Sequence, residues 1–419
     1  MATIELTDEE HSMARDEAGP AAGLAMRVVA ETAGWLGARC LLPIASAHID
    51  GCLYHGDSGV EFAHRLVADG ARVAVPTTLN VGALDLIHPE RVSADPGRRS
   101  MARALMDAYV TMGCAPTWTC APYQAGHRPA VGTDVAWGES NAVVFCNSVL
   151  GARTNRYGDF LDICCALTAR APDAGLHRPE NRRARVVVET GGLSSALRDA
   201  DAFYPVLGAW LGAELGETVA AITGLPANLA EDRLKALGAS AASEGAVGLF
   251  HVAGTTPEAP DVETALGGIA PERTIALTPA MICAARDALS TVAGDGLDAV
   301  ALGSPHFSST EFAAFERLRA GRRFAQPVYI CTGRGVLAEL VNAGQDEDMR
   351  AAGVVLVADT CVVVTPILPA GGGVVMTNSG KFAHYTPANT GYEVVYGSLA
   401  DCVESAVAGR IVRDESLWN

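Results

Sequence analysis

Residues 299–306, with the sequence AVALGSPH, decide the fold, because a short apolar run passes directly into a turn of Gly, Ser and Pro. Similar apolar runs recur at 328–330 and 354–357. Patterns typical of helices lie between them, at 309–318 and 336–341. Short apolar runs of this kind indicate parallel strands buried on both faces, with helices as the crossovers. The sequence therefore predicts an α/β fold with largely parallel sheets and right-handed crossovers.

The same alternation extends over the whole chain, which is too long for one small core. Further apolar runs at 72–75, 185–188 and 248–252 are predicted to be buried strands. With 419 residues, the chain is expected to form two or three α/β lobes. Prolines and arginines interrupt the apolar pattern near 171–185, and we expect a surface connection between lobes there.

Candidate ligands follow three of the predicted strands at the point where each strand ends. Ser304, Cys331 and Cys361 each lie in the turn after an apolar run. Open α/β sheets place their binding sites at the carboxyl ends of the strands. Because successive strand–helix units lead to a common edge of one sheet, distant cysteines can converge there without a CxxC motif. The alternative is that these are ordinary turns with buried thiols.

A second chemically distinctive stretch, GESNAVVFCNSVLGARTNR, occupies residues 138–156. It combines an apolar core with Glu, Ser and Asn side chains and with Arg153 and Arg156. Guanidinium groups match carboxylates, and Asn supplies both a donor and an acceptor, so the stretch is typical of a site for a small anionic substrate. The alternative is a polar helix start followed by a buried strand, with both arginines solvated.

Composition excludes several classes of partner. The formal net charge of -17 disfavours nucleic acid, because phosphate backbones are bound by clustered Lys and Arg. No apolar run is long enough to cross a bilayer, and acidic residues crowd the start of the chain in place of a signal peptide. We therefore expect a soluble, cytoplasmic protein with no membrane partner. The eleven cysteines are then expected to be free thiols, metal ligands or catalytic groups, with Cys164 and Cys165 packed in a core.

Two further segments carry chemistry. Residues 116–123, PTWTCAPY, hold Cys120 between two prolines, and together with Cys361 it would supply the soft thiolates that iron prefers. Residues 376–385, MTNSGKFAHY, place Lys381 beside small polar side chains. So dense a set of polar groups indicates a binding site more than a solvated loop.

The segments that carry this chemistry resemble the large, catalytic region of aconitase X, a divergent branch of the aconitase superfamily. The matching segments, in chain order, are 48–51, 76–80, 116–123, 138–156, 303–308, 359–361 and 378–385. The resemblance implies aconitase-like α/β/α layers and a dehydratase, which is a hydro-lyase that uses an iron–sulfur cluster. The known activities of the branch are on cis-3-hydroxy-L-proline and on mevalonate 5-phosphate.

The resemblance also implies roles for individual residues. Cys120 and Cys361 would ligate the cluster. Residues expected to line the substrate site are Glu139, Ser140, Asn80, Lys381 and the turn of Gly51, Cys52 and Leu53. Further candidate substrate contacts are Val81, Arg153, Asn378 and Ser379. The candidate catalytic residues are Glu139, Ser140, Lys381 and His48.

The chain departs from the family pattern at the third cluster ligand. Phosphomevalonate members of the family have a Cys where this sequence has Ser304, and a hydroxyl is a poor substitute for a thiolate at iron. We therefore expect a smaller cluster, such as 2Fe-2S, or recruitment of Cys52, Cys283 or Cys331. The same departure favours the hydroxyproline branch, whose bacterial members resemble this chain in lacking that Cys.

The second departure concerns a whole domain. The aconitase superfamily adds a small swivelling domain that closes over the site and offers a serine. No segment before residue 48 or after residue 385 is long enough to form it. We therefore expect a separate small subunit, so that the enzyme is a heteromer.

These expectations combine into a reaction hypothesis, in which water is eliminated from cis-3-hydroxy-L-proline to give 1-pyrroline-2-carboxylate. The cluster would act as a Lewis acid on the hydroxyl, while Lys381 stabilises negative charge at the substrate carboxylate. Glu139 would bind the ring ammonium or relay a proton. The base is left open among the partner's serine, His48, His306 and His384.

Three other functions are alternatives. A dehydratase of mevalonate 5-phosphate would need additional cations for the phosphate, which the acidic composition disfavours. An iron-responsive regulator that binds RNA is disfavoured by the absence of a basic stripe. The third alternative is a metal-free binding subunit whose catalysis resides elsewhere.

Overall fold

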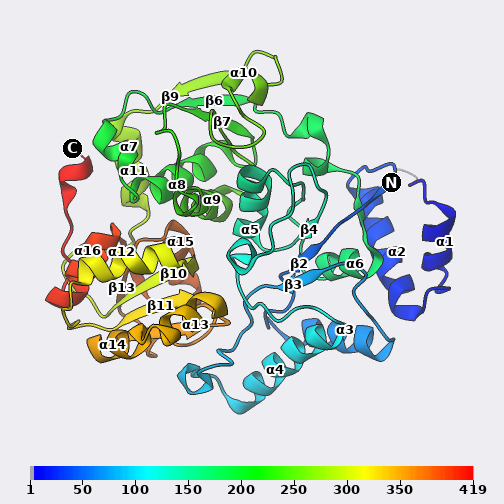
Figure 1. The fold of residues 1–419 in the computed structure, drawn as a ribbon, viewed down its shortest axis with the longest axis horizontal. Helices are drawn as coiled ribbons and strands as arrows, with labels where there is room; N and C mark the ends of the chain where they lie inside the picture. The colour runs from blue at the N-terminus through cyan, green and yellow to red at the C-terminus, as the bar shows by residue number, and fades with distance from the viewer. Residues whose placement is uncertain (1–3, 419) are drawn as a thin grey trace. The chain divides into compact units, whose positions relative to one another are not determined.

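The structure, a computed structural model that describes residues 4–418, divides into two compact units. Unit 1 contains the residues up to 84 together with 94–183, and unit 2 contains 85–93 and the residues from 184 onward. Each unit combines helices with sheets whose strands are mostly parallel (Figure 1), which confirms the predicted α/β class.

Unit 1 is built around a small parallel sheet in the order β3-β2-β4, and a second sheet pairs β1 with β5 antiparallel. In chain order its main elements are α1 (Asp8–Ala14), α2 (Pro20–Trp35), β1 (Leu41–Pro43), β2 (Ala47–Ile49), α3 (Asp57–Ala68), β3 (Thr77–Leu79), α4 (Pro96–Thr111), β4 (Ala136–Trp137), α5 (Ser140–Phe145), α6 (Leu161–Thr168) and β5 (Arg170–Pro172). Helix α6 packs against both β2 and α2, and so lies between the parallel sheet and that helix.

Residues 138–156 begin as a helix and do not contain the strand that the alternative interpretation required. Glu139 caps α5 by accepting a hydrogen bond from the backbone N–H of Ala142 (2.9 Å). The helix continues as a π-helical turn, Cys146–Leu150. It ends at Gly151, whose φ of 71° lies in the left-handed region that favours glycine. The stretch is therefore capped at both ends and delivers Glu139 at a helix start.

The predicted strand at 72–75 is wrong. The backbone N–H groups of Val73 and Ala74 donate to the carbonyl oxygens of Met112 and Ala166, at 2.9 and 2.8 Å. These acceptors belong to the end of α4 and to α6, so no neighbouring strand is available to the segment. The apolar run therefore links α3 to β3 outside any sheet.

The segment 171–185 is not wholly exposed. It begins within β5, and Arg182 is buried. The guanidinium of Arg182 donates to the side-chain oxygen of Asn147 (3.0 Å) and to the carbonyl oxygen of Ala152 (3.1 Å). A buried cation is costly unless its donors are satisfied, and these bonds tie the segment to residues 138–156.

Unit 2 contains two sheets in which all neighbouring strands are parallel, in the orders β8-β7-β6-β9 and β12-β11-β10-β13-β14. In chain order its main elements are β6 (Val186–Glu189), α7 (Ser195–Asp199), α8 (Phe203–Leu215), β7 (Ala220–Thr223), α9 (Glu231–Gly245), β8 (His251–Val252), α10 (Val262–Ala265), β9 (Arg273–Ala276), α11 (Pro279–Ala288), β10 (Ala299–Phe307), α12 (Ser309–Arg319), β11 (Val328–Thr332), α13 (Arg334–Asn342), α14 (Gln345–Ala352), β12 (Val354–Ala358), β13 (Val374–Thr377), α15 (Gly380–Thr390), β14 (Glu393–Tyr396) and α16 (Leu399–Ala408).

The apolar runs of unit 2 behave as the sequence predicted. The strands expected at 185–188, 248–252, 299–302, 328–330 and 354–357 are confirmed as β6, β8, β10, β11 and β12. A hydrophobic core lies between the five-stranded sheet and helices α12, α13, α14 and α16. This core holds the sheet rigid, so that the turns at its carboxyl edge have fixed positions.

The register of β10 is broken between Leu302 and Phe307. Gly303 has a φ of 87° and approaches Cys331 so closely that a Cβ on it would overlap the carbonyl oxygen of Cys331. Glycine meets both conditions at once. The break carries Ser304 out of the regular ladder at the carboxyl end of the sheet.

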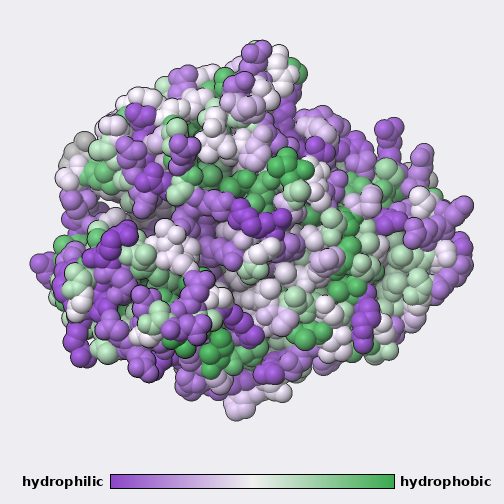
Figure 2. Space-filling model, viewed as in Figure 1, coloured by the Kyte–Doolittle hydropathy of each residue, from purple (hydrophilic) through white to green (hydrophobic). Residues whose placement is uncertain are grey.

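None of the helices within residues 4–418 combines the length and the apolar character that crossing a bilayer requires. Figure 2 shows a face covered largely by hydrophilic side chains, with apolar residues in separate patches.

A substitution in the α8–α9 contact tests the packing of unit 2. A Cβ on Gly208 of α8 would overlap the carbonyl oxygen of Leu237 in α9. We expect Gly208→Ala to destabilise the protein by about 1–3 kcal/mol, because the helices must move apart, even though alanine has the higher helix propensity. The midpoint of urea unfolding measures the effect. Gly191→Ala, at an exposed glycine with open space around it, is the control, and equal shifts in the two variants would contradict the argument.

Candidate active site

The carboxyl ends of β2, β3 and β4 meet at one edge of the unit 1 sheet and present Asp50, Asn80 and Gly138 there. The side-chain amide of Asn80 donates a hydrogen bond to the carboxylate of Asp50. The backbone N–H of Gly138 donates across the sheet to the carbonyl oxygen of His48 (2.9 Å). The structure thus brings together the starts of three segments that the sequence analysis assigned to the substrate site.

Asp162, a fully buried residue of α6, holds this edge in place. Its carboxyl group accepts hydrogen bonds from the backbone N–H groups of Asp50 (2.6 Å) and Gly51 (3.3 Å). A Cβ on Gly138 would come within 2.7 Å of the same carboxyl oxygen. Burial raises the pKa of Asp162 to about 8, although the hydrogen bond from Asp50 opposes the shift. Sequence reasoning missed this residue, whose only signal is one charge inside the apolar run 160–167.

The turn 51–53 is held from its other side by the thiol of Cys52. This sulfur is buried and lies 3.4–3.7 Å from carbonyl oxygens at the ends of β2 and β3. Burial, followed by the neighbouring carboxylates, raises the pKa of Cys52 well above its usual value. The protonated sulfur is suited to holding the turn and is a poor metal ligand. Of the other residues predicted here, Leu53 is half-buried and Val81 is buried.

His48, in β2, is fully buried and belongs to a chain of hydrogen bonds. Its Nδ1 lies 2.8 Å from the hydroxyl of Thr78, which lies 2.7 Å from Nδ1 of His127. Nε2 of His127 lies 2.8 Å from the hydroxyl of Ser46. Because the Thr78 hydroxyl carries one proton, it can donate to only one of the two rings, so at least one of the two Nδ1 atoms must carry a proton to hydrogen-bond with it.

Both rings in this chain are neutral at neutral pH. Burial lowers the pKa of His48 well below its ordinary value and lowers the pKa of His127 to about 4. Nε2 of His48 finds no hydrogen-bond partner within the described part of the chain. His48 is therefore a neutral imidazole with one nitrogen available for a proton.

Glu139 and Ser140 stand at the amino end of α5. The hydroxyl of Ser140 donates a long hydrogen bond to the Glu139 carboxylate (3.4 Å). The side-chain amide of Asn141 donates to the carbonyl oxygen of Cys120 (2.7 Å), and Cys120 is buried. The structure thus joins two predicted catalytic residues and one predicted cluster ligand at one helix end.

The two arginines predicted to face a substrate differ in environment. Arg156 is exposed, whereas Arg153 is half-buried and its backbone forms a bridge with Asp134. The buried cation that reaches residues 138–156 is Arg182, which the sequence analysis did not select. No local pattern distinguishes a buried arginine from a solvated one, so no signal in the sequence could have found it.

In unit 2 the structure brings Cys361, which follows β12, together with Cys331 near the end of β11 and with Ser304 in the irregular part of β10, so Ser304 and Cys331 lie within strands and not in the predicted turns. Cys331 and Ser304 each form a side-chain hydrogen bond with Cys361. The bond with Cys331 lowers the pKa of Cys361, against the opposing effect of burial, and the charge of Lys381 acts in the same direction. This is the convergence predicted from the position of the three turns.

A turn at the same edge carries Asn378 and Ser379, between β13 and α15. The hydroxyl of Ser379 donates to the carbonyl oxygen of Ser304 and accepts a hydrogen bond from the backbone N–H of Phe382 (3.1 Å). Lys381 follows in the first turn of α15. The carboxyl edge of this sheet therefore carries the predicted polar and cationic groups of unit 2.

The other two candidate bases are already engaged. His306 is buried, with Nε2 3.3 Å from the carbonyl oxygen of Thr360. Burial, followed by the charges of Lys235 and Lys381, lowers the pKa of His306 to about 4. His384 lies with Nδ1 3.0 Å from the carboxylate of Glu244.

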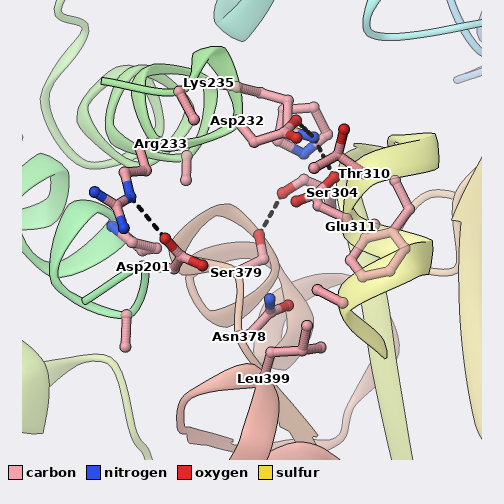
Figure 3. A pocket seen from close by; sticks show the side chains of 18 of the residues that line it. Asp201, Asp232, Arg233, Lys235, Ser304, Thr310, Glu311, Asn378, Ser379 and Leu399 are labelled. Atoms are coloured by element: carbon pink, nitrogen blue, oxygen red, sulfur yellow. Dashed lines mark hydrogen bonds and ion pairs between the residues drawn. The ribbon is translucent and has the colours of Figure 1, made fainter. Parts of the chain in front are cut away.

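A cavity of about 140 Å³ adjoins the turns after β10 and β13 (Figure 3). Its charged lining residues pair with one another: Arg233 lies 2.7 Å from Asp201, and Lys235 binds Asp232 (2.9 Å) and Glu311. Burial alone would lower the pKa of Lys235, but its two carboxylate partners outweigh burial and raise it, so the ammonium stays charged. These ion pairs also escaped the sequence analysis.

The metal-binding donors are divided between the units. Across residues 4–418, no three His, Cys, Asp or Glu side chains form a group that could hold a metal ion. Cys120 belongs to unit 1 and Cys361 to unit 2. Two cysteines of unit 2 were considered as additional cluster ligands. Cys331 forms a hydrogen bond with Cys361, whereas the sulfur of Cys283 lies 3.3 Å from the carbonyl oxygen of Trp418.

Three domain models of one protein family match this chain in order. The aconitase X first domain matches residues 3–180, the second domain matches 184–287 and the third matches 297–408. The chain belongs to the aconitase X family. The resemblance inferred from the sequence motifs is therefore confirmed.

Relatives of this aconitase X chain include two kinds of dehydratase. The chain is 45% identical to the cis-3-hydroxy-L-proline dehydratase of Pseudomonas aeruginosa, over 98% of this chain and 71% of that protein. It is 35% identical to the phosphomevalonate dehydratase large subunit of Methanothermobacter thermautotrophicus, over 94% of this chain and 96% of that protein. The crystal structure of the holo-form of Thermococcus kodakaraensis aconitase X matches with a TM-score of 0.85 and 32% identity, over 96% of this chain and all of that one.

The raised pKa of Asp162 predicts a pH dependence of stability. The folded protein keeps this carboxyl protonated up to about pH 8, whereas an unfolded carboxyl loses its proton near pH 4. The stability contributed by the protonated group is therefore complete below about pH 4 and is lost as the pH rises towards 8, by about 1.4 kcal/mol for each pH unit.

Asp162→Asn removes this titration, so the free energy of unfolding of the native chain minus that of the variant should fall between pH 5 and pH 8. Urea unfolding at a series of pH values measures the difference. Asp50 and Asp159 are the carboxylates whose charges act on Asp162, and both are kept in the variant. A difference that stays constant across this range would show that Asp162 is already ionised in the folded protein.

Proposed function

We propose that this aconitase X chain is the catalytic part of a dehydratase that removes water from cis-3-hydroxy-L-proline and yields 1-pyrroline-2-carboxylate. The observation that carries the proposal is 45% identity to a cis-3-hydroxy-L-proline dehydratase over 98% of the chain, against 35% to a phosphomevalonate dehydratase large subunit. Ser304, where phosphomevalonate members have a Cys, supports the same choice. All eleven cysteines are free thiols, which suits the reducing cytoplasm.

The candidate residues match the two charges of this zwitterionic substrate. The ammonium of Lys381 would hold the substrate carboxylate, with Asn378 and Ser379 as neighbouring donors. Removal of the α-proton moves negative charge towards that carboxylate, and a fixed cation there lowers the barrier. The carboxylate of Glu139 would bind the ring ammonium, and Ser140 beside it would hydrogen-bond to the substrate.

The chain supplies thiols with the chemistry that an iron–sulfur cluster needs. Cys361 is buried in contact with a second thiol and within the field of Lys381, and Cys120 is a buried thiol on a loop held by Asn141. Thiolates are the ligands that such clusters use. When bound, the cluster would supply a Lewis acid for the departing C3 hydroxyl. A small cluster such as 2Fe-2S suits this limited donor set.

His48 is the chain's own candidate for taking up a proton, because it is neutral and its Nε2 is available. The hydroxyl of Thr78 and the ring of His127 would hold Nδ1 in one tautomer, so that Nε2 presents a lone pair. A serine of a partner subunit is the second candidate. Either group could act as the base. His306 and His384 are not needed for this step, because each already contacts another group, the carbonyl oxygen of Thr360 and the carboxylate of Glu244 respectively.

We also propose a separate small subunit. The support is the relative that is named a large subunit, of which this chain covers 96%. The match covers 71% of the Pseudomonas aeruginosa relative, so that protein also contains sequence outside the matched part. A second polypeptide would provide the swivelling domain that closes the site in this superfamily.

The first test is turnover. The chain prepared under anaerobic conditions and mixed with its small subunit should convert cis-3-hydroxy-L-proline to 1-pyrroline-2-carboxylate, while the chain alone should not. Liquid chromatography with mass detection follows the product. Turnover of mevalonate 5-phosphate in its place would overturn the substrate assignment, and full activity of the chain alone would overturn the proposed partner.

Lys381 can be tested by itself, because the sequence contains only one other lysine, Lys235. Lys381→Ala should lower kcat/KM by about 10²–10³-fold, and Lys381→Arg should lose less, because the charge is retained. An amine-selective reagent should label half-buried Lys381 in preference to buried, ion-paired Lys235, and substrate should protect it. Unchanged kcat/KM in Lys381→Ala, or equal labelling of the two lysines, would remove Lys381 from the site.

A further inference from the structure

Cys331 stands beside Cys361 although the two are far apart in the chain. Cys331 is the next-to-last residue of β11, and Cys361 follows β12, its neighbour in the sheet. Their side chains share a hydrogen bond, and both are buried. The two thiols are in contact and are not joined by a disulfide, so both are soft donors that could bind one metal centre.

The backbone of β10 approaches this pair of cysteines closely. Gly303 lies at the register break within β10, and because it has no side chain it can approach the carbonyl oxygen of Cys331. The close approach brings the hydroxyl of Ser304 to the same sulfur of Cys361. Three neighbouring strands thus converge on Cys361, and they offer it one thiol and one hydroxyl.

We propose that Cys331 is the sulfur ligand of the iron–sulfur cluster beside Cys361, and that Ser304 supports the pair by hydrogen bonding without ligating iron. The inference rests on the proposed function, because it concerns the cluster of that enzyme. Thiolate is the softer donor, and iron in such clusters selects sulfur over a neutral hydroxyl. The nearby charge of Lys381 would offset the negative charge of two thiolates and the cluster.

The other cysteines considered for this role are bound elsewhere. The sulfur of Cys52 faces three backbone carbonyl oxygens, which repel a thiolate and hold the thiol in its protonated form. The sulfur of Cys283 contacts the carbonyl oxygen of Trp418. Cys331 is the cysteine that the fold of unit 2 places against Cys361.

Iron content tests the inference without reference to turnover. The full chain is reconstituted anaerobically with ferrous iron and sulfide, together with the variants Cys331→Ala, Cys361→Ala and Ser304→Ala. Cys402→Ala, at a buried thiol in the core of unit 2, is the matched control. Bound iron, acid-labile sulfide and visible absorbance are measured for each protein. We expect Cys331→Ala and Cys361→Ala to lose most of the bound iron and acid-labile sulfide, because each variant removes a sulfur ligand, and Ser304→Ala and Cys402→Ala to keep them.

A ligand swap keeps the test decisive if Cys331→Ala folds poorly. The double variant Cys331→Ser with Ser304→Cys moves the thiol to the other side of Cys361 and should regain part of the cluster that Cys331→Ser alone loses. Native iron and sulfide in Cys331→Ala, with loss in Ser304→Ala, would overturn the inference and leave the proposed function intact. Absence of iron from the native chain itself would overturn the cluster of the proposed function.

Discussion

The parallel register of β10, β11 and β12 is the constraint on which the chemistry of unit 2 depends. Parallel strands bring their carboxyl ends to one edge, so residues from distant parts of the sequence reach the same place. A shift of one residue would turn Cys331 to the opposite face of the sheet and separate it from Cys361. The break in β10 at Gly303 adds the finer adjustment, because it lets Ser304 approach the same sulfur.

Unit 1 meets the same need with a buried carboxyl group. Its central strands are only two or three residues long, so the ladder alone gives little rigidity to the loops that follow. Asp162 compensates by binding the backbone of the turn that starts at Asp50, and Gly138 packs on the same oxygen. The cost of burying this carboxyl appears as its raised pKa. Positional order at the carboxyl edge of a sheet is thus obtained by strand register in one unit and by a buried acid in the other.

Features that depend on a short stretch of sequence were predictable, whereas features that depend on tertiary contacts were not. Strands β10, β11 and β12 were predictable because each contains a short, continuously apolar run, whereas β13 and β14 of the same sheet were not predicted. The meeting of Cys331 with Cys361 followed from parallel topology. The run at 72–75 has the same composition, but its N–H groups are taken by α4 and α6, which only tertiary structure determines. The structural roles of Asp162 and Arg182 were not predicted, for a related reason. A buried charge has the same sequence signature as a solvated one, and its burial depends on which segments arrive around it.

The distribution of cations links these structural demands to the chemistry. Arginine serves structure here, as with Arg182, whose planar guanidinium bonds several oxygens at once. Lys235 likewise has a structural role, because its ammonium forms ion pairs with two carboxylates. Lys381 differs, because its charge contributes to lowering the pKa of Cys361, whereas both lysines contribute to lowering the pKa of His306. One ammonium therefore favours a thiolate and a neutral imidazole at the same edge. A compact charge on a flexible stem can do this and still reach a small carboxylate, which a guanidinium held by several fixed partners cannot.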